Sequence, residues 1–115
     1  HLPRLIGEAR AKGLAMLGEL VTAEQAESWG LIWKVIDDAS LMPEATRLVA
    51  HLATQPTYGL GLIKEAMNQS AGNTLDRQLD VERELQRKAG STPDYAEGVR
   101  AFMEKRAPRF TGRRS

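Results

Sequence analysis

The sequence predicts a mainly α-helical fold that contains one short strand. Most of the chain places apolar residues at steps of three and four, which is the period of a helix. Glycines, prolines and threonines separate these segments, as helix ends and helix caps do. Only residues 31–36, Leu-Ile-Trp-Lys-Val-Ile, combine β-branched and aromatic residues as a strand does.

The first third of the chain predicts two helices. A stripe of apolar residues from Leu5 to Leu17 indicates a first helix, and Gly18 is a natural stop for it. Thr22 is expected to cap a short second helix over residues 23–29, because Gln25 stands at the reciprocal position of a capping box.

The central segment predicts three more helices. A helix is expected over residues 41–52, with Pro43 tolerated in its first turn. Another follows Pro56, with an apolar stripe at Leu60, Ile63 and Met67. The next, over residues 74–88, is highly charged, with a thin stripe at Leu75, Leu79 and Leu85 and ion pairs expected between Asp80 and Arg83 and between Glu84 and Lys88.

A last helix is expected to begin after Thr92, which suits an N-cap, and Asp94 complements its dipole. One face carries Tyr95, Val99 and Phe102. Lys105 and Arg106 are expected in its last turn, and Pro108 forbids continuation.

The composition is that of a globular protein, with 42% hydrophobic and 27% charged residues and a net charge of +1. Residues 1–99 are acidic overall and residues 100–115 are basic. The absence of cysteine excludes disulfides and thiolate chemistry. No apolar run reaches the length of a membrane span and nothing resembles a signal peptide, so we expect a cytoplasmic protein without a membrane partner.

Few residues suggest catalysis. His1 and His51 are isolated, and the adjacent Asp37 and Asp38 are typical of a turn. No phosphate loop, zinc spacing or nucleophile elbow is present, so we expect no catalytic residue and no metal ligand in residues 1–115.

Phe102 and Lys105 are the remaining candidates for a site. An aromatic ring and a cation at a helix end suit a phosphorylated adenine nucleotide, the ring by stacking and the ammonium by pairing with phosphate. The alternative is structural: Phe102 packs in a core, and Lys105 complements the helix dipole.

The order of residues from Asp94 to Gly112 resembles the closing signature of the crotonase family, which comprises enoyl-CoA hydratases, enoyl-CoA isomerases and their relatives. Residues 7–36 and 60–67 are similar to further blocks of that family, so the resemblance covers essentially the whole chain. Trp33 and residues 53–64 look most like a branch that isomerises ring-epoxide thioesters of CoA.

The resemblance implies an acyl-CoA enzyme with an N-terminal ββα-spiral core and a C-terminal helical domain that packs a homo-trimer or a dimer of trimers. Two backbone N–H groups of that core would stabilise a thioester enolate, and core carboxylates would move protons. Coenzyme A would be the carrier part of the substrate, with no separate cofactor. Phe102 and Lys105 match the family residues near the adenine and the 3′-phosphate of CoA.

Residues 1–115 resemble only the C-terminal helical part of the fold, without the spiral core. The chain begins at His1 instead of a methionine, which predicts a cut inside a longer polypeptide. A single strand has no partner within the chain, which agrees with that prediction.

Two other classes of protein fit parts of the sequence. A free-standing helical adaptor would bind a protein partner through its apolar faces. A nucleic-acid binder would use the basic tail for phosphate contacts, but the body is acidic and carries no recognition motif, so we expect no nucleic-acid partner.

Overall fold

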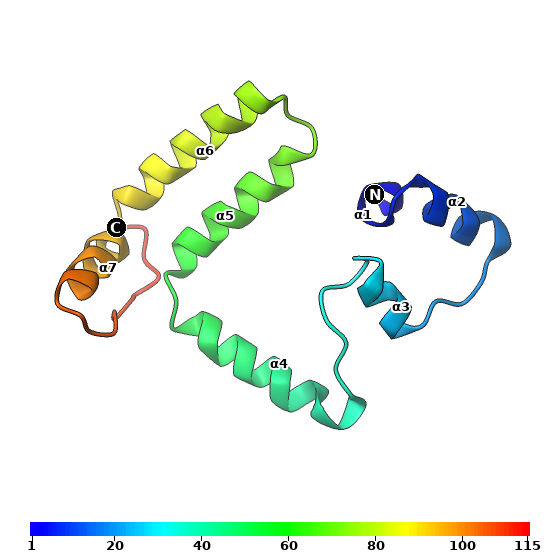
Figure 1. The fold of residues 1–115 in the computed structure, drawn as a ribbon. Helices are drawn as coiled ribbons and strands as arrows, with labels where there is room; N and C mark the ends of the chain where they lie inside the picture. The colour runs from blue at the N-terminus through cyan, green and yellow to red at the C-terminus, as the bar shows by residue number, and fades with distance from the viewer. The chain divides into compact units, whose positions relative to one another are not determined.

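The computed structural model describes residues 1–115 and contains seven α-helices and no strand (Figure 1). The mainly α-helical prediction is therefore confirmed, and the predicted strand is wrong. The chain divides into two compact units, residues 1–44 and 45–115, which are described separately. None of the seven helices has the length and apolar character that a membrane span requires.

The first unit opens with two helices where the sequence predicts one. Helix α1 (Leu2–Ile6) and helix α2 (Glu8–Leu17) meet at Gly7, whose φ of 81° lies in the left-handed region and interrupts the helical path. The predicted stop at Gly18 is confirmed, because this residue has a φ of 66° and its N–H bonds to the Leu14 carbonyl.

Helix α3 (Ala23–Ser28) has the predicted cap at its N-terminus. The Thr22 hydroxyl accepts from the Gln25 N–H at 3.2 Å, and the Gln25 side chain accepts from the Thr22 N–H at 3.0 Å. At its other end Gly30 has a φ of 76°, and its backbone lies near the Leu5 carbonyl of α1.

Residues 31–36 do not form the predicted strand because no second strand exists to pair with them. Their backbone donors bond to α3 instead. The N–H groups of Leu31 and Ile32 donate to the Ala26 carbonyl at 2.9 and 3.3 Å, and the Val35 N–H donates to the Glu27 carboxylate at 3.0 Å. Carbonyl and side-chain acceptors of α3 therefore hold a segment that has no regular secondary structure.

Helix α4 (Asp38–Ala53) begins three residues before the predicted start, and Asp37 precedes it with its carbonyl bonded to the Ser40 N–H. Pro43 consequently lies inside the helix and not in its first turn, which corrects the prediction. Its ring removes one backbone donor from α4 at that point.

The second unit is built on a hairpin of two antiparallel helices, α5 (Thr57–Ser70) and α6 (Leu75–Gly90), which lie side by side in Figure 1. Its core consists of Leu62, Val81 and Leu85, with Tyr58, Ala66 and Ala89 packed around them. Gln78 adds a polar link, because its side-chain amide donates to the Ala66 carbonyl at 3.2 Å. The core is small and lies between the two helices.

The buried faces of this hairpin differ from the predicted stripes. Leu85 is buried as predicted, but Leu75, Leu79, Ile63 and Met67 are all exposed. The predicted ion pair between Asp80 and Arg83 forms at 2.7 Å, and Thr74, predicted as the first helical residue, is instead the N-cap of α6. Glu84 pairs with Arg87 and not with Lys88.

Candidate functional site

The site predicted at the end of the chain lies on helix α7 (Pro93–Met103) and on the residues that follow it. The helix starts as predicted, because the Thr92 hydroxyl accepts from the Tyr95 N–H at 3.2 Å. Pro93 fills the first helical position, where the missing N–H costs nothing. Tyr95, Val99 and Phe102 share one face, and that face is uncovered.

Helix α7 ends earlier than predicted, at Met103, so Lys105 and Arg106 lie beyond its last turn. The Lys105 N–H bonds to the Phe102 carbonyl at 3.2 Å, and the Arg106 N–H bonds to the Ala101 carbonyl at 3.0 Å. These two bonds form a Schellman motif. Lys105 occupies its left-handed position, with a φ of 51°, and is the only non-glycine residue of the chain with a positive φ.

Residues 106–112, which we call the C-terminal strap, fold back along α7 and bind two of its carboxylates. Glu97 accepts a bidentate pair of bonds from the Arg106 guanidinium at 2.6 and 3.0 Å, and a third bond from the Arg109 N–H at 2.9 Å. The guanidinium first, and the Arg109 N–H second, lower the pKa of Glu97 to about 2. Arg106 is therefore engaged within the chain.

Asp94 binds the far end of the strap and is almost completely buried. Its carboxylate accepts from the N–H and hydroxyl of Thr111 at 2.7 and 3.0 Å and from the Gly112 N–H at 2.7 Å. Burial alone would raise the pKa of Asp94, but these three donors hold it below its ordinary value. The sequence suggested only a helix-dipole role for Asp94, because a contact over seventeen residues leaves no local signal.

A groove of about 410 Å³ lies beside the uncovered face of α7. Aromatic rings from three parts of the second unit line it: Tyr58 of α5, Tyr95 and Phe102 of α7, and Phe110 of the strap. Phe110 also packs over Gly98. The strap thus supplies one wall of the groove, which sequence periodicity could not show.

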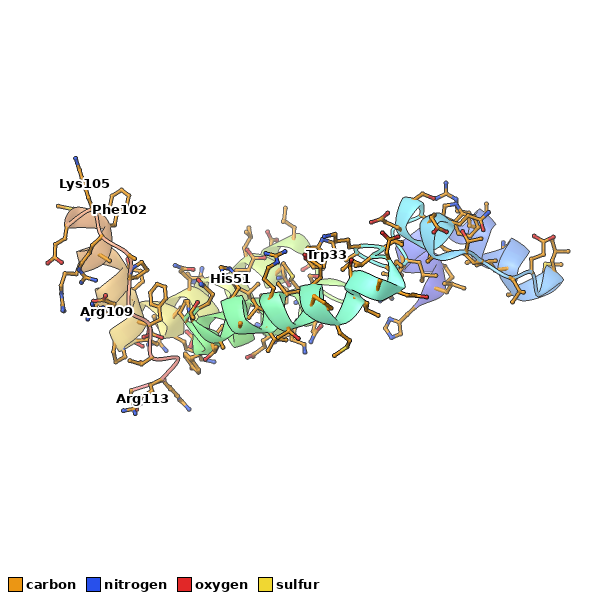
Figure 2. The ribbon with its side chains drawn as sticks, turned by 90° about the horizontal axis from the view of Figure 1, so that it is seen from below. Trp33, His51, Phe102, Lys105, Arg109 and Arg113 are labelled. Atoms are coloured by element: carbon orange, nitrogen blue, oxygen red, sulfur yellow. The ribbon has the colours of Figure 1, made fainter.

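Phe102 and Lys105 lie at the same end of α7, while Arg109 and Arg113 lie farther along the tail (Figure 2). The Phe102 side chain is 82% exposed, so within this chain it is not the core residue that the structural alternative required. Lys105 has no carboxylate partner among the ion pairs of the structure, and it lies outside the helix whose dipole it was expected to complement. His51 is exposed on α4, and no acidic or histidine cluster forms around it.

The strap should loosen in acid. Glu97 has a pKa of about 2 in the folded chain against an ordinary 4.5, and the pKa of Asp94 is also lowered. A carboxylate whose pKa is lowered by folding stabilises the folded state fully at pH values above its ordinary pKa. That contribution is lost as the pH falls through the lower pKa that the group has in the folded chain. We therefore expect the amide NMR signal of Arg109 to shift as the pH falls from about 4.5 toward 2, and those of Thr111 and Gly112 to shift below the ordinary pKa of Asp94, which is 3.8.

The Arg77 amide provides the control for this titration. Its acceptor is the hydroxyl of Thr74, which does not ionise in this range. Equal shifts at Arg77 and at the strap would indicate general unfolding and contradict local release of the strap.

Comparison with known proteins places this chain in a family. A family model described as enoyl-CoA hydratase/isomerase matches residues 1–113. The chain belongs to the enoyl-CoA hydratase/isomerase family. Over 112 residues it is 60% identical to the 1,2-epoxyphenylacetyl-CoA isomerase of Escherichia coli, covering 97% of this chain and 43% of that protein. The predicted likeness to an isomerase branch of the family is confirmed.

Further relatives give the same picture. A protein named as a probable enoyl-CoA hydratase of Rhodobacter capsulatus is 42% identical, with 97% of this chain and 44% of that protein covered. The crystal structure of an enoyl-CoA hydratase from Bacillus anthracis superposes with a TM-score of 0.90 at 33% identity, covering 97% of this chain and 43% of that one. The chain spans less than half the length of these relatives, and the matched part is helical.

Proposed function

We propose that residues 1–115 form the C-terminal helical part of an acyl-CoA isomerase or hydratase, and that ring-1,2-epoxyphenylacetyl-CoA is its substrate. The observation that supports this proposal is the sequence identity of 60% to the 1,2-epoxyphenylacetyl-CoA isomerase of Escherichia coli, compared with 42% to the probable enoyl-CoA hydratase of Rhodobacter capsulatus. An oxyanion hole that stabilises a thioester enolate would lie in the spiral core, outside this chain. Assay of the full-length polypeptide with the ring epoxide and with an enoyl thioester tests the choice, because faster hydration of the enoyl thioester would overturn it.

Within that enzyme, Phe102 and Lys105 would contact the nucleotide end of coenzyme A. Phe102 offers an uncovered ring for stacking on adenine, and Lys105 offers an ammonium without a carboxylate partner for the 3′-phosphate. Both are held by the end of α7, where the backbone of Lys105 is bonded to that of Phe102. Coenzyme A is the carrier part of the substrate in this proposal, and no residue here takes part in the chemical step.

Replacing Lys105 by alanine or by glycine in the full-length polypeptide tests this contact. Both changes remove the ammonium, so KM for the CoA thioester should rise up to about fivefold while kcat stays nearly constant, because the contact is remote from the reacting atoms. The two variants should differ in stability. Glycine relieves the left-handed backbone of Lys105 and should be more stable than alanine by about 1 kcal/mol.

A truncated thioester that lacks the nucleotide supplies the control for these variants. It should respond little to either change, because it has no phosphate to lose. If KM rose in the less stable Lys105→Ala variant but not in the more stable Lys105→Gly variant, Lys105 would act only by shaping the turn and would not contact the nucleotide.

The segment would also assemble subunits. Large apolar side chains stay exposed in each unit, Met16 in the first and Met67, Leu75 and Met103 in the second, and subunit contacts would cover them. We expect a homo-trimer or a dimer of trimers for the full-length polypeptide. The adaptor alternative shares this surface but predicts no coenzyme A binding, so specific binding of coenzyme A decides between the two.

A further inference from the structure

The backbone of Lys105 is held in a conformation that a lysine rarely adopts. Its φ of 51° falls in the left-handed region, where the Cβ of an L-residue approaches the following carbonyl. Glycine is the usual residue at this position of a Schellman motif. A strained lysine persists only where the surrounding structure determines its conformation, so a group nearby must fix it.

Glu97 is the group that fixes the residue next to Lys105. Its carboxylate accepts hydrogen bonds from both terminal nitrogens of Arg106. The side chain of Glu97 is only 16% exposed, so this ion pair is partly shielded from solvent. The Arg106 Nε also pairs with Glu104 at 2.6 Å, which closes the turn from its other side. With Arg106 clamped and the Lys105 N–H bonded to Phe102, the backbone on both sides of Lys105 is fixed.

We infer that Glu97 is a positioning residue for coenzyme A binding: through Arg106 it holds Lys105 in its left-handed conformation beside Phe102. Glu97 does not touch the nucleotide itself. The inference rests on the proposed contact between Lys105 and the 3′-phosphate. If so, loss of the Glu97 charge weakens the binding preference for the 3′-phosphate, even though Lys105, which contacts that phosphate, is still present.

Asp94 does not share this role, although it binds the same strap. It contacts Thr111 and Gly112, at the opposite end of the strap from Lys105. Gly112 has a φ of 71°, and a side chain there would collide with the Thr57 hydroxyl of α5. Asp94 therefore docks the end of the strap at the start of α5, whereas Glu97 acts at the turn.

The experiment measures binding of coenzyme A and of 3′-dephospho-coenzyme A to the full-length polypeptide by calorimetry. The ratio of the two dissociation constants is the 3′-phosphate preference. We compare the wild type with Glu97→Gln, with Lys105→Ala and with the double variant. Lys105→Ala should lower the preference up to about fivefold, and Glu97→Gln about threefold. In the double variant Glu97→Gln should lower it no further, because the group it positions is gone.

Glu84→Gln is the matched control. Glu84 forms a bidentate pair with Arg87 at 2.8 and 3.0 Å on α6, and neither residue touches the strap. This variant should keep the preference of the wild type. If Glu97→Gln does not fold, Arg106→Lys replaces it, since a lysine keeps the charge but loses the bidentate geometry.

Two results would overturn the inference while the Lys105 contact stands: a full preference in Glu97→Gln, or an equal further loss when Glu97→Gln is added to Lys105→Ala. An unchanged preference in Lys105→Ala would instead overturn the proposed phosphate contact, and the inference with it. A threefold loss that disappears in the double variant supports both.

Discussion

The 115-residue chain on its own is expected to leave ring-1,2-epoxyphenylacetyl-CoA and enoyl-CoA thioesters unchanged. Acid–base catalysis by a carboxyl group is most effective near neutral pH when the pKa of that group is raised toward neutrality. Every carboxylate of this chain with a displaced pKa is displaced downward: Glu24, Glu84, Asp94 and Glu97. Asp94 and Glu97 are also occupied by the strap, so neither is available to move a substrate proton.

The measurement is turnover of both thioesters by material whose intact mass matches the 115-residue chain. The full-length polypeptide, assayed at the same molar concentration, is the positive control. The difference should be the whole of the enzymatic rate, because the proposed enzyme has its oxyanion hole and its acid–base pair outside residues 1–115. Turnover above the uncatalysed rate by the short chain would refute the placement of the chemistry outside residues 1–115.

Replacing Leu85 by alanine is expected to destabilise the hairpin of α5 and α6 by about 2 kcal/mol. Leu85 is 6% exposed and is one of the three buried residues between the two helices of the hairpin. The other two core side chains, Leu62 of α5 and Val81 of α6, cannot move far enough to fill the space that Leu85 would leave, so a cavity would remain. Urea unfolding followed by circular dichroism gives the free energy directly.

Leu79→Ala is the control for this change. Leu79 lies on the same helix and belongs to the same predicted stripe, but it is 53% exposed. Its replacement should cost less than about 0.5 kcal/mol in the isolated chain. Similar losses at Leu79 and Leu85 would contradict the core described above.

Three helix ends are a part of the fold that the sequence determined by itself, although the start of α4 and the end of α7 differ from the prediction. The caps at Thr22 and Thr92 and the stop at Gly18 form as predicted, because a cap depends on residues within one turn of the helix end. The same local reasoning missed the break at Gly7, because a glycine near a helix start is compatible with continuation or with a turn.

The sequence names candidate residues for the site but does not show their geometry, and their role stays a prediction. Phe102 and Lys105 were found because helix periodicity and a family signature coincide there. That Phe102 is uncovered, and that Lys105 sits in a left-handed turn, depends on where α7 ends. The helix ends five residues before Pro108, at the turn where the two Schellman bonds form and Arg106 pairs with Glu97.

Only the tertiary structure decided which faces are buried and what the carboxylates of α7 do. Periodicity shows that Leu79 and Leu85 share a stripe, but burial depends on where α5 crosses α6, which no local pattern specifies. Asp94 bonds to Thr111 and Gly112 of the strap, seventeen and eighteen residues further along the chain. Residues 31–36 show the same limit, because strand-forming residues pair only when a partner strand lies beside them.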